Sequence, residues 1–340
     1  MRIILHIGLY KTGTTAVQKF FARNRSELAR RGVLYPESAT KYDAHHPLPW
    51  ALGVGHRDKD SSVSPERVVR AILREADSAG AETVILSSEE FINLEAAERL
   101  SKLKRLFDSH AVEILIYLRR QDSLLLSSYG QHVRMYSIRF SGTISDFLLK
   151  HSNFLSKYNY WGMLQRWANV FGSDAMRIKL YDQARFPEGN IVEDFADTLG
   201  INLDGCDARK VSGINRNLSD LGLEVLRRLN AMPLDEAMHH RLIRLLDESP
   251  LQGQGDYRLL SRRNRQELMR QFANSNARVA RHWLGREDGV LFEGREQPDG
   301  AGDSPGYERP NDDLVVDALI DCLVRSVSCP ADKADRPWHG

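Results

Sequence analysis

Residues 2–15 read RIILHIGLYKTGTT, and this stretch decides the fold. Its first six residues are mostly apolar and predict a short buried strand. The next eight, Gly8–Thr15, place two glycines and three threonines around Lys11, and we call them the phosphate loop. Apolar side chains then recur at helical spacing over residues 14–30. A glycine-bearing turn between a strand and a helix directs backbone N–H groups and the positive helix end at an anion. Lys11 adds a positive charge, so this loop suits a phosphate or a phosphosulfate.

The rest of the chain continues the alternation of strands and helices. Such alternation is typical of a parallel sheet with crossover helices. Further strands are predicted at 33–35, 83–86, 112–118 and 176–181, and helices at 65–79, 95–107, 123–135, 160–171 and 191–199. Residues 37–63 are predicted to form a polar loop, and Ser64 to cap the helix that follows. From residue 218 onward only helices are predicted, at 218–230, 236–248 and 262–283. We therefore predict an α/β fold, a P-loop-type and mainly parallel sheet flanked by helices, with a helical C-terminal portion.

Composition excludes several classes of protein. The 340 residues carry 47 Lys and Arg against 46 Asp and Glu, so the basic excess of a general nucleic-acid binder is missing. The three cysteines are not in CxxC spacing, and neither a disulfide framework nor a metal site is predicted. The apolar run at the start is too short for a signal peptide, and no run reaches the ~18 apolar residues of a membrane helix. We predict a cytoplasmic protein with no membrane span.

A second anion anchor follows the strand predicted at 112–118. The chain continues as Arg119–Tyr129, RRQDSLLLSSY, with Arg119 at the strand end and Ser127 about two helical turns later. The carboxyl ends of parallel strands are where ligands bind in open α/β sheets. Arginine presents a planar fork that suits phosphate. Arg119 and Ser127 are therefore predicted to converge on one anion, although two surface arginines at a strand end would leave the same pattern.

Taken together, the segments HIGxxKTGTTxxQ and LRRQDSxxxSSY resemble the two signatures of the sulfotransferase superfamily that uses 3′-phosphoadenosine 5′-phosphosulfate (PAPS). The resemblance covers roughly residues 1–200 and is greatest to bacterial members acting on carbohydrates or small metabolites. It implies that the 5′-phosphosulfate is held by Lys11, Thr12, Gly13, Thr14 and Thr15. It also implies that Arg119 and Ser127 hold the 3′-phosphate, with Arg120 as a helper. The acceptor would be a small molecule or a glycan that offers a hydroxyl, or alternatively an amine.

The pattern of strands, helices and linker predicts three parts of the chain. Residues 1–210 would be the PAPS-binding core, 211–292 a helical part that closes the acceptor side, and 293–340 a linker and tail with a helix at 314–327. The glycine-rich RKGxxGxW segment of the steroid and phenol enzymes has no match. The tripeptide at 215–217, NRN, could do part of its work or could simply cap a helix.

Sulfuryl transfer calls for an electrophilic cation and a base. Lys11 is predicted to bridge the sulfate and the departing 5′-phosphate. Three groups remain open as the base that takes the acceptor proton, namely Glu89, His46 and Glu37. Glu89 follows the strand at 83–86, where the steroid and phenol enzymes place a catalytic histidine. A helix cap is the alternative role for Glu89, and a solvated loop position is the alternative for His46.

Two other functions compete with sulfotransfer. A P-loop kinase would carry its lysine after the second glycine and a strand-terminal Asp for magnesium, whereas Lys11 precedes Gly13 here. A nucleotide-binding protein without catalysis would keep the loop and lose the base. Lys11, Arg119, Ser127 and several candidate bases are all present, which favours an enzyme.

Overall fold

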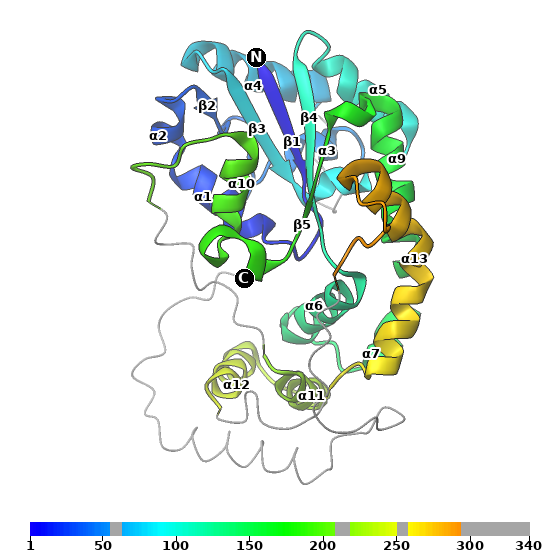
Figure 1. Cartoon of the computed structure of the whole chain (residues 1–340). Coiled ribbons are helices and arrows are strands. Elements are labelled where there is room, and N and C mark those ends of the chain that lie inside the picture. Colours follow the sequence, from blue (N-terminus) through cyan, green and yellow to red (C-terminus); the bar gives the residue numbers. More distant parts are fainter. Residues whose placement is uncertain (55–62, 208–217, 250–257, 294–340) are drawn as a thin grey trace. The chain divides into compact units, whose positions relative to one another are not determined.

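The computed structural model describes residues 1–54, 63–207, 218–249 and 258–293. In these residues β1 (Arg2–Ile7), β2 (Val33–Leu34), β3 (Thr83–Ser88), β4 (Ala111–Leu118) and β5 (Met176–Leu180) form one sheet of order β2-β3-β1-β4-β5. Every neighbouring pair is parallel (Figure 1). The predicted α/β class is therefore confirmed, and the carboxyl ends of β1, β3 and β4 share one edge of the sheet.

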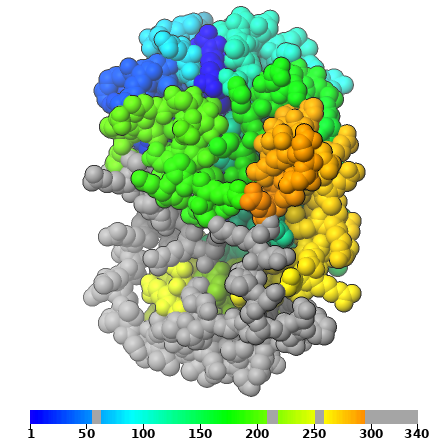
Figure 2. Space-filling model, viewed as in Figure 1, coloured from blue at the N-terminus to red at the C-terminus, as the bar shows by residue number. Residues whose placement is uncertain are grey.

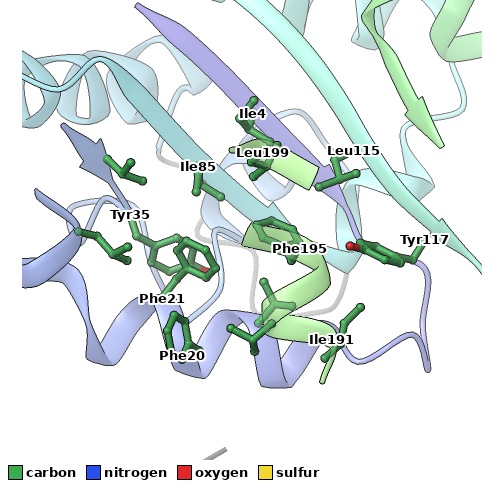
Figure 3. Close-up of a cluster of buried hydrophobic side chains, with 14 of the residues drawn as sticks. Ile4, Phe20, Phe21, Tyr35, Ile85, Leu115, Tyr117, Ile191, Phe195 and Leu199 are labelled. Atoms are coloured by element: carbon green, nitrogen blue, oxygen red, sulfur yellow. The ribbon is translucent and has the colours of Figure 1, made fainter. Parts of the chain in front are cut away.

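The sheet is buried on both faces because helices cover each of them. Ile4 belongs to a cluster that joins the strands to α1 (Thr14–Arg23), α2 (Arg25–Ala29) and α10 (Ile191–Leu199) (Figure 3). Ile3 and Leu5 alternate with Ile4, so they point to the opposite face, and both are fully buried. Double-sided burial explains why these strands read as continuous apolar runs. The α10 helix lies in front of the sheet in Figure 1, and its yellow-green atoms form part of the surface in the space-filling view (Figure 2).

The remaining helices complete the layers. In the described residues they are α3 (Pro47–Ala51), α4 (Pro65–Ala79), α5 (Ala97–Leu106), α6 (Gln121–Arg134), α7 (Ile144–Lys150), α8 (Phe154–Lys157), α9 (Tyr160–Phe171), α11 (Asp220–Leu229), α12 (Glu236–Glu248) and α13 (Arg262–Leu284). Short 3-10 turns lie at Glu89–Asn93, Ser173–Ala175, Gln183–Arg185 and Pro187–Gly189. The α9 helix contacts β4, β5 and α5.

Local signals set several helix ends as predicted. The Ser64 hydroxyl accepts a hydrogen bond from the Arg67 N–H and so caps α4. Gly80 ends α4 and Gly200 ends α10, each in the left-handed conformation that glycine adopts without strain. The predicted bounds of α4, α9, α10 and α12 agree with the structure.

Two predicted segments were wrong in part, and one helix was missed. The helix expected over 14–30 breaks at Asn24, whose side-chain amide donates to the Phe20 carbonyl and whose oxygen accepts from the Asp207 N–H. The loop expected over 37–63 contains α3, which is too short to show a helical period. The α7 helix was not predicted, although Thr143 and Asp146 form a reciprocal capping box at its start.

The chain divides into two compact units. The first comprises residues 1–124, 155–214 and 272–294 and holds the sheet with the phosphate loop. The second comprises 125–154, 215–271 and 295–340. In the second unit, the Asn230 amide donates to the Val133 and Phe140 carbonyls, and its oxygen meets His239 Nε2 at 3.1 Å. The linker and tail predicted at 293–340 lie outside the described residues except for Glu293, as do the helix predicted at 314–327 and the tripeptide at 215–217.

Candidate active site

The phosphate loop is a tight turn that runs into α1, and its last two residues, Thr14 and Thr15, are the first two of that helix. Lys11 has φ 67° and Gly13 has φ 75°, so two residues of the turn adopt the left-handed conformation. Gly13 is the residue before the helix, and the first N–H groups of α1, those of Thr14 and Thr15, have no acceptor within the helix. Thr15 is exposed at this helix end. These N–H groups and the helix dipole favour an anion here.

The other two threonines hold the loop in shape. Thr12 Oγ1 donates to the Leu9 carbonyl at 2.6 Å, and Thr14 Oγ1 meets the same carbonyl at 3.4 Å. Both side chains are buried. Thr12 and Thr14 were predicted to contact the 5′-phosphosulfate, and their hydroxyl groups are directed to the loop's own backbone in this structure. The backbone N–H groups at the start of α1 and the Lys11 side chain are the other groups of the loop that could hold an anion.

The two glycines of the loop are required by close packing. A Cβ atom at Gly8 would lie 2.7 Å from Thr14 Cγ2 and 3.3 Å from Glu89 Cγ. A Cβ atom at Gly13 would lie 3.2 Å from both Tyr181 and Ile191 side-chain atoms, in addition to the left-handed φ. Gly8 thus lets the loop close against Thr14 and brings Glu89 against the loop.

Arg119 ties the second predicted anchor to the first. It follows the end of β4, and its Nη1 donates to the Lys11 carbonyl at 2.7 Å. The Arg119 carbonyl accepts from the Tyr160 hydroxyl at 2.5 Å, and its guanidinium carbon lies 5.3 Å from the Tyr181 ring centroid. Burial lowers the pKa of Arg119, but an arginine stays charged at neutral pH. The structure therefore places a partly buried positive charge beside Lys11.

The other residues of that anchor have different surroundings. Arg120 Nε pairs with Asp122 Oδ1 at 3.0 Å, and the same oxygen accepts from the Ser123 N–H at the start of α6. Arg120 is thus engaged at the helix start. Ser127 lies further along α6 and belongs to the second unit. Its contact with a 3′-phosphate stays a prediction.

Glu89 lies against the phosphate loop. It opens the 3-10 turn after β3, and its Oε2 accepts a hydrogen bond from Gln18 Nε2 at 3.0 Å. Ser88 Oγ accepts from the Glu90 N–H at 3.1 Å and caps this turn. Capping is therefore done by Ser88, so the Glu89 side chain is not needed for that role.

His46 lies at the same strand end. Its Nδ1 is 2.7 Å from Ser88 Oγ, and its ring stacks on Trp50 with centroids 5.3 Å apart. Burial lowers the pKa of His46, while the negative charges of Glu89 and Glu90 raise it by a smaller amount. The ring is therefore neutral near pH 7 and could accept a proton. The structure thus groups two of the three candidate bases, Glu89 and His46, at the carboxyl end of β3.

The third candidate, Glu37, is held elsewhere. Its side chain is exposed, and its backbone N–H donates to the Glu75 carboxylate of α4 at 2.8 Å. The Ser38 N–H binds the second oxygen of Glu75. The described contacts do not include one between Glu37 and the phosphate loop.

Several residues beside the loop were missed by sequence reasoning. Lys157 Nζ lies 5.0 Å from the Tyr10 ring centroid, and the Tyr10 hydroxyl is 3.5 Å from Asn93 Nδ2. Burial together with the Glu90 charge raises the pKa of Tyr10 to about 12, and burial lowers the pKa of Lys157. Tyr10 could have been noted from its place in the loop. Lys157 is 147 positions further along the chain and carries no local signal.

Within the described ranges, no group of three or more His, Cys, Asp or Glu side chains could hold a metal ion. No helix in the described part of the chain is long and apolar enough to cross a membrane.

Comparisons with known proteins give limited matches. No protein-family model matches the chain. A protein from Archaeoglobus fulgidus, described as uncharacterized, is 29% identical over 215 residues, which are 63% of this chain and 57% of that protein. The match thus spans less than two thirds of the relative's length. The crystal structure of a sulfotransferase from Alicyclobacillus acidocaldarius aligns with a TM-score of 0.38 and 19% identity, over 70% of this chain and 98% of that one.

Proposed function

We propose that this protein is a PAPS-dependent sulfotransferase that acts on a hydroxyl group of a carbohydrate or small metabolite. The observation that carries the proposal is the 2.7 Å hydrogen bond from Arg119 Nη1 to the Lys11 carbonyl. It joins the two segments whose residues resemble the phosphosulfate and 3′-phosphate signatures. The two segments follow the carboxyl ends of the adjacent parallel strands β1 and β4, which is where a nucleotide binds in such sheets.

The residues present fit an anionic nucleotide. The phosphate loop contains Lys11 and leads directly to the N–H groups at the start of α1. The charge of Arg119 lies beside it, because Arg119 binds the Lys11 carbonyl. PAPS supplies the sulfuryl group, which passes from the 5′-phosphate oxygen to the acceptor oxygen and leaves 3′-phosphoadenosine 5′-phosphate. Lys11 would neutralise the charge that develops on the departing phosphate oxygen. Helix N–H groups would hold the 5′-phosphate in line with the acceptor.

Glu89 is the proposed base. An alcohol has a pKa far above 7, so a base within hydrogen-bond reach would speed transfer by ~10²–10⁴. Glu89 packs against the loop at Gly8, and one of its oxygens is already fixed by Gln18. The proton of the acceptor hydroxyl would move to the other oxygen as the new O–S bond forms. His46 is the second candidate, because its neutral ring lies beside the same strand end.

A phosphotransferase is the competing proposal, and the position of Lys11 in the phosphate loop argues against it. The strands next to the loop end in Ser88 followed by Glu89, and in Leu118 followed by Arg119. A magnesium-dependent kinase needs a carboxylate on the metal at such a strand end and a lysine after the second glycine. Glu89 could supply the former, but Lys11 precedes Gly13. A binding protein without catalysis would bind PAPS and transfer nothing.

A transfer assay with sulfur-labelled PAPS tests the proposal. The acceptor panel would include sugars, glycolipids, phenols and amino alcohols, and wild type would be compared with Lys11→Ala. The control is Lys19→Ala, which removes a lysine from α1 outside the loop. We expect transfer by wild type and by the control, with a loss of at least 100-fold in Lys11→Ala.

A failure to bind the nucleotide would overturn the proposal. Isothermal calorimetry that detects no binding of PAPS or of 3′-phosphoadenosine 5′-phosphate would remove the cofactor assignment. Binding of ATP with phosphoryl transfer to an acceptor would favour the kinase. Comparing Glu89→Gln with His46→Gln then decides the base, because only the variant that lacks the base should lose turnover while retaining nucleotide affinity.

A further inference from the structure

A buried hydrogen-bonded chain runs from the interior of the sheet to Glu89. His6 Nδ1 in β1 lies 2.8 Å from Ser87 Oγ in β3. Gln18 Nε2, from α1, contacts Ser87 Oγ at 3.3 Å and Glu89 Oε2 at 3.0 Å. Gln18 is only 5% exposed, and His6 and Ser87 are almost completely buried. Three separate elements therefore contribute to the support of one carboxylate.

The donors and acceptors in this chain fix the direction of the Gln18 amide. Its NH₂ group has two hydrogens, one for Ser87 Oγ and one for Glu89 Oε2. The opposite orientation would turn the amide oxygen towards the carboxylate, where two acceptors would face each other. Burial lowers the pKa of His6 to about 3, so His6 is neutral and adds no charge to the chain. Of the four hydrogen-bonded residues, Glu89 is the one with a charged side chain.

We propose that Gln18 is a positioning residue for the base, holding Glu89 Oε2 so that Oε1 is presented to the acceptor hydroxyl. This inference rests on the proposed sulfotransferase function. Glutamate has three side-chain torsions, and a carboxylate left to sample them would often lie outside hydrogen-bond reach of the acceptor. A buried amide donor, itself anchored on Ser87, selects the productive rotamer at no cost at the moment of transfer.

The Gln18 side chain also connects α1, the helix that follows the phosphate loop, to Ser87 of β3 and to Glu89. Gln18 lies one turn into α1, so the same side chain links the base to the start of that helix. A purely structural role would follow from this link alone, with Gln18 simply tying α1 to β3. The two roles differ in one respect. A positioning residue acts through Glu89, whereas a structural tie acts whatever residue stands at position 89.

A double-mutant cycle separates these roles. Gln18→Met keeps the volume of the side chain and removes both donors. We expect it to lower kcat about 10- to 100-fold, with the KM values for PAPS and for the acceptor changing less than twofold. In the Glu89→Gln background, which lacks the base, the same substitution should change kcat by less than twofold. Asn24→Leu is the control, because it removes a buried amide from the end of α1 without touching Glu89.

A second variant gives a readout that does not depend on turnover. Gln18→Glu sets two carboxylates against each other and should lower the melting temperature. Combining it with Glu89→Gln restores a carboxylate-to-amide hydrogen bond with its polarity reversed. The swapped pair should recover most of the melting temperature and none of the turnover. This arm also serves if Gln18→Met fails to fold.

The contrary outcomes distinguish a failure of the role proposed for Gln18 from a failure of the proposed function. An equal loss of kcat in both backgrounds would make Gln18 a structural tie and overturn the inference. Full activity of Gln18→Met, or of Glu89→Gln, would overturn it as well, and wild-type turnover would still leave the sulfotransferase proposal standing. Absence of transfer by wild type to every acceptor would instead overturn the proposed function and this inference together.

Discussion

Protonation of His45 should destabilise the fold in mild acid, because this ring is held neutral in the interior. His45 is fully buried, its Nδ1 accepts from the Ser87 N–H at 3.1 Å, and its Nε2 donates to the Pro36 carbonyl at 3.0 Å. A second proton on Nδ1 would point at the Ser87 N–H. Burial lowers the pKa of His45 from 6.5 to about 3. Between about pH 6.5 and pH 3, His45 therefore binds a proton in the unfolded chain but not in the folded chain.

The size of the effect follows from linkage. The folded-state pKa of His45 is lowered, so its contribution to stability is complete above pH 6.5 and is lost as the pH falls from 6.5 towards 3. At pH 5 the unfolded histidine is about 30-fold more protonated than neutral, which corresponds to about 2 kcal/mol lost from the free energy of unfolding. His6, whose pKa burial also lowers to about 3, adds a similar loss.

Urea denaturation of wild type and His45→Gln at pH 7.5 and pH 5 measures this directly, with fluorescence of the buried Trp167 as the signal. At pH 7.5 the variant should be less stable by about 1–3 kcal/mol, because the Ser87 N–H or the Pro36 carbonyl loses its partner. At pH 5 the deficit should shrink by about 2 kcal/mol, since the variant has no ring to protonate. Ser64→Ala removes a helix cap and no titratable group, so its deficit should be the same at both pH values. If His45→Gln were destabilised by the same amount at pH 7.5 and at pH 5, the reasoning would be refuted.

Three other perturbations test the loop and the core. Gly8→Ala places a Cβ 2.7 Å from Thr14 Cγ2, so affinity for 3′-phosphoadenosine 5′-phosphate should fall at least tenfold in calorimetry, and an unchanged affinity would contradict the proposed packing. Arg119→Met removes the charge-assisted hydrogen bond to the Lys11 carbonyl. It should lower the free energy of unfolding by about 1.5–3 kcal/mol and the affinity for the nucleotide at least tenfold. A variant that binds the nucleotide as tightly as wild type would exclude Arg119 from the site. Phe195→Ala empties a fully buried position between α10 and the sheet and should cost about 3–5 kcal/mol in urea denaturation, and a loss below 1 kcal/mol would show that the layer repacks.

Local features of the chain determined much of the architecture. The run at 2–7 followed by the loop around Lys11 predicts a strand, a turn and a helix, and the structure has all three. Capping residues such as Ser64 and Gly200 act on the helix end beside them, so the ends that they cap in α4 and α10 follow from the local sequence. Alternating strands and helices likewise predicted the parallel sheet. The break at Asn24 could not be predicted, because one of its bonds goes to Asp207, which is 183 positions away.

The arrangement of the candidate site was decided by the tertiary structure. The strand order sets β1 between β3 and β4, and only this order brings Glu89 and Arg119 to opposite sides of the loop that follows β1. Sequence reasoning proposed Glu89, His46 and Glu37 as alternatives, and the fold groups the first two at one strand end while Glu37 binds α4 through its backbone. Residue types and local spacing name the chemistry that a chain can perform. Which of those residues meet depends on contacts between elements far apart in sequence, and these form only when the strands pair and bury their apolar faces.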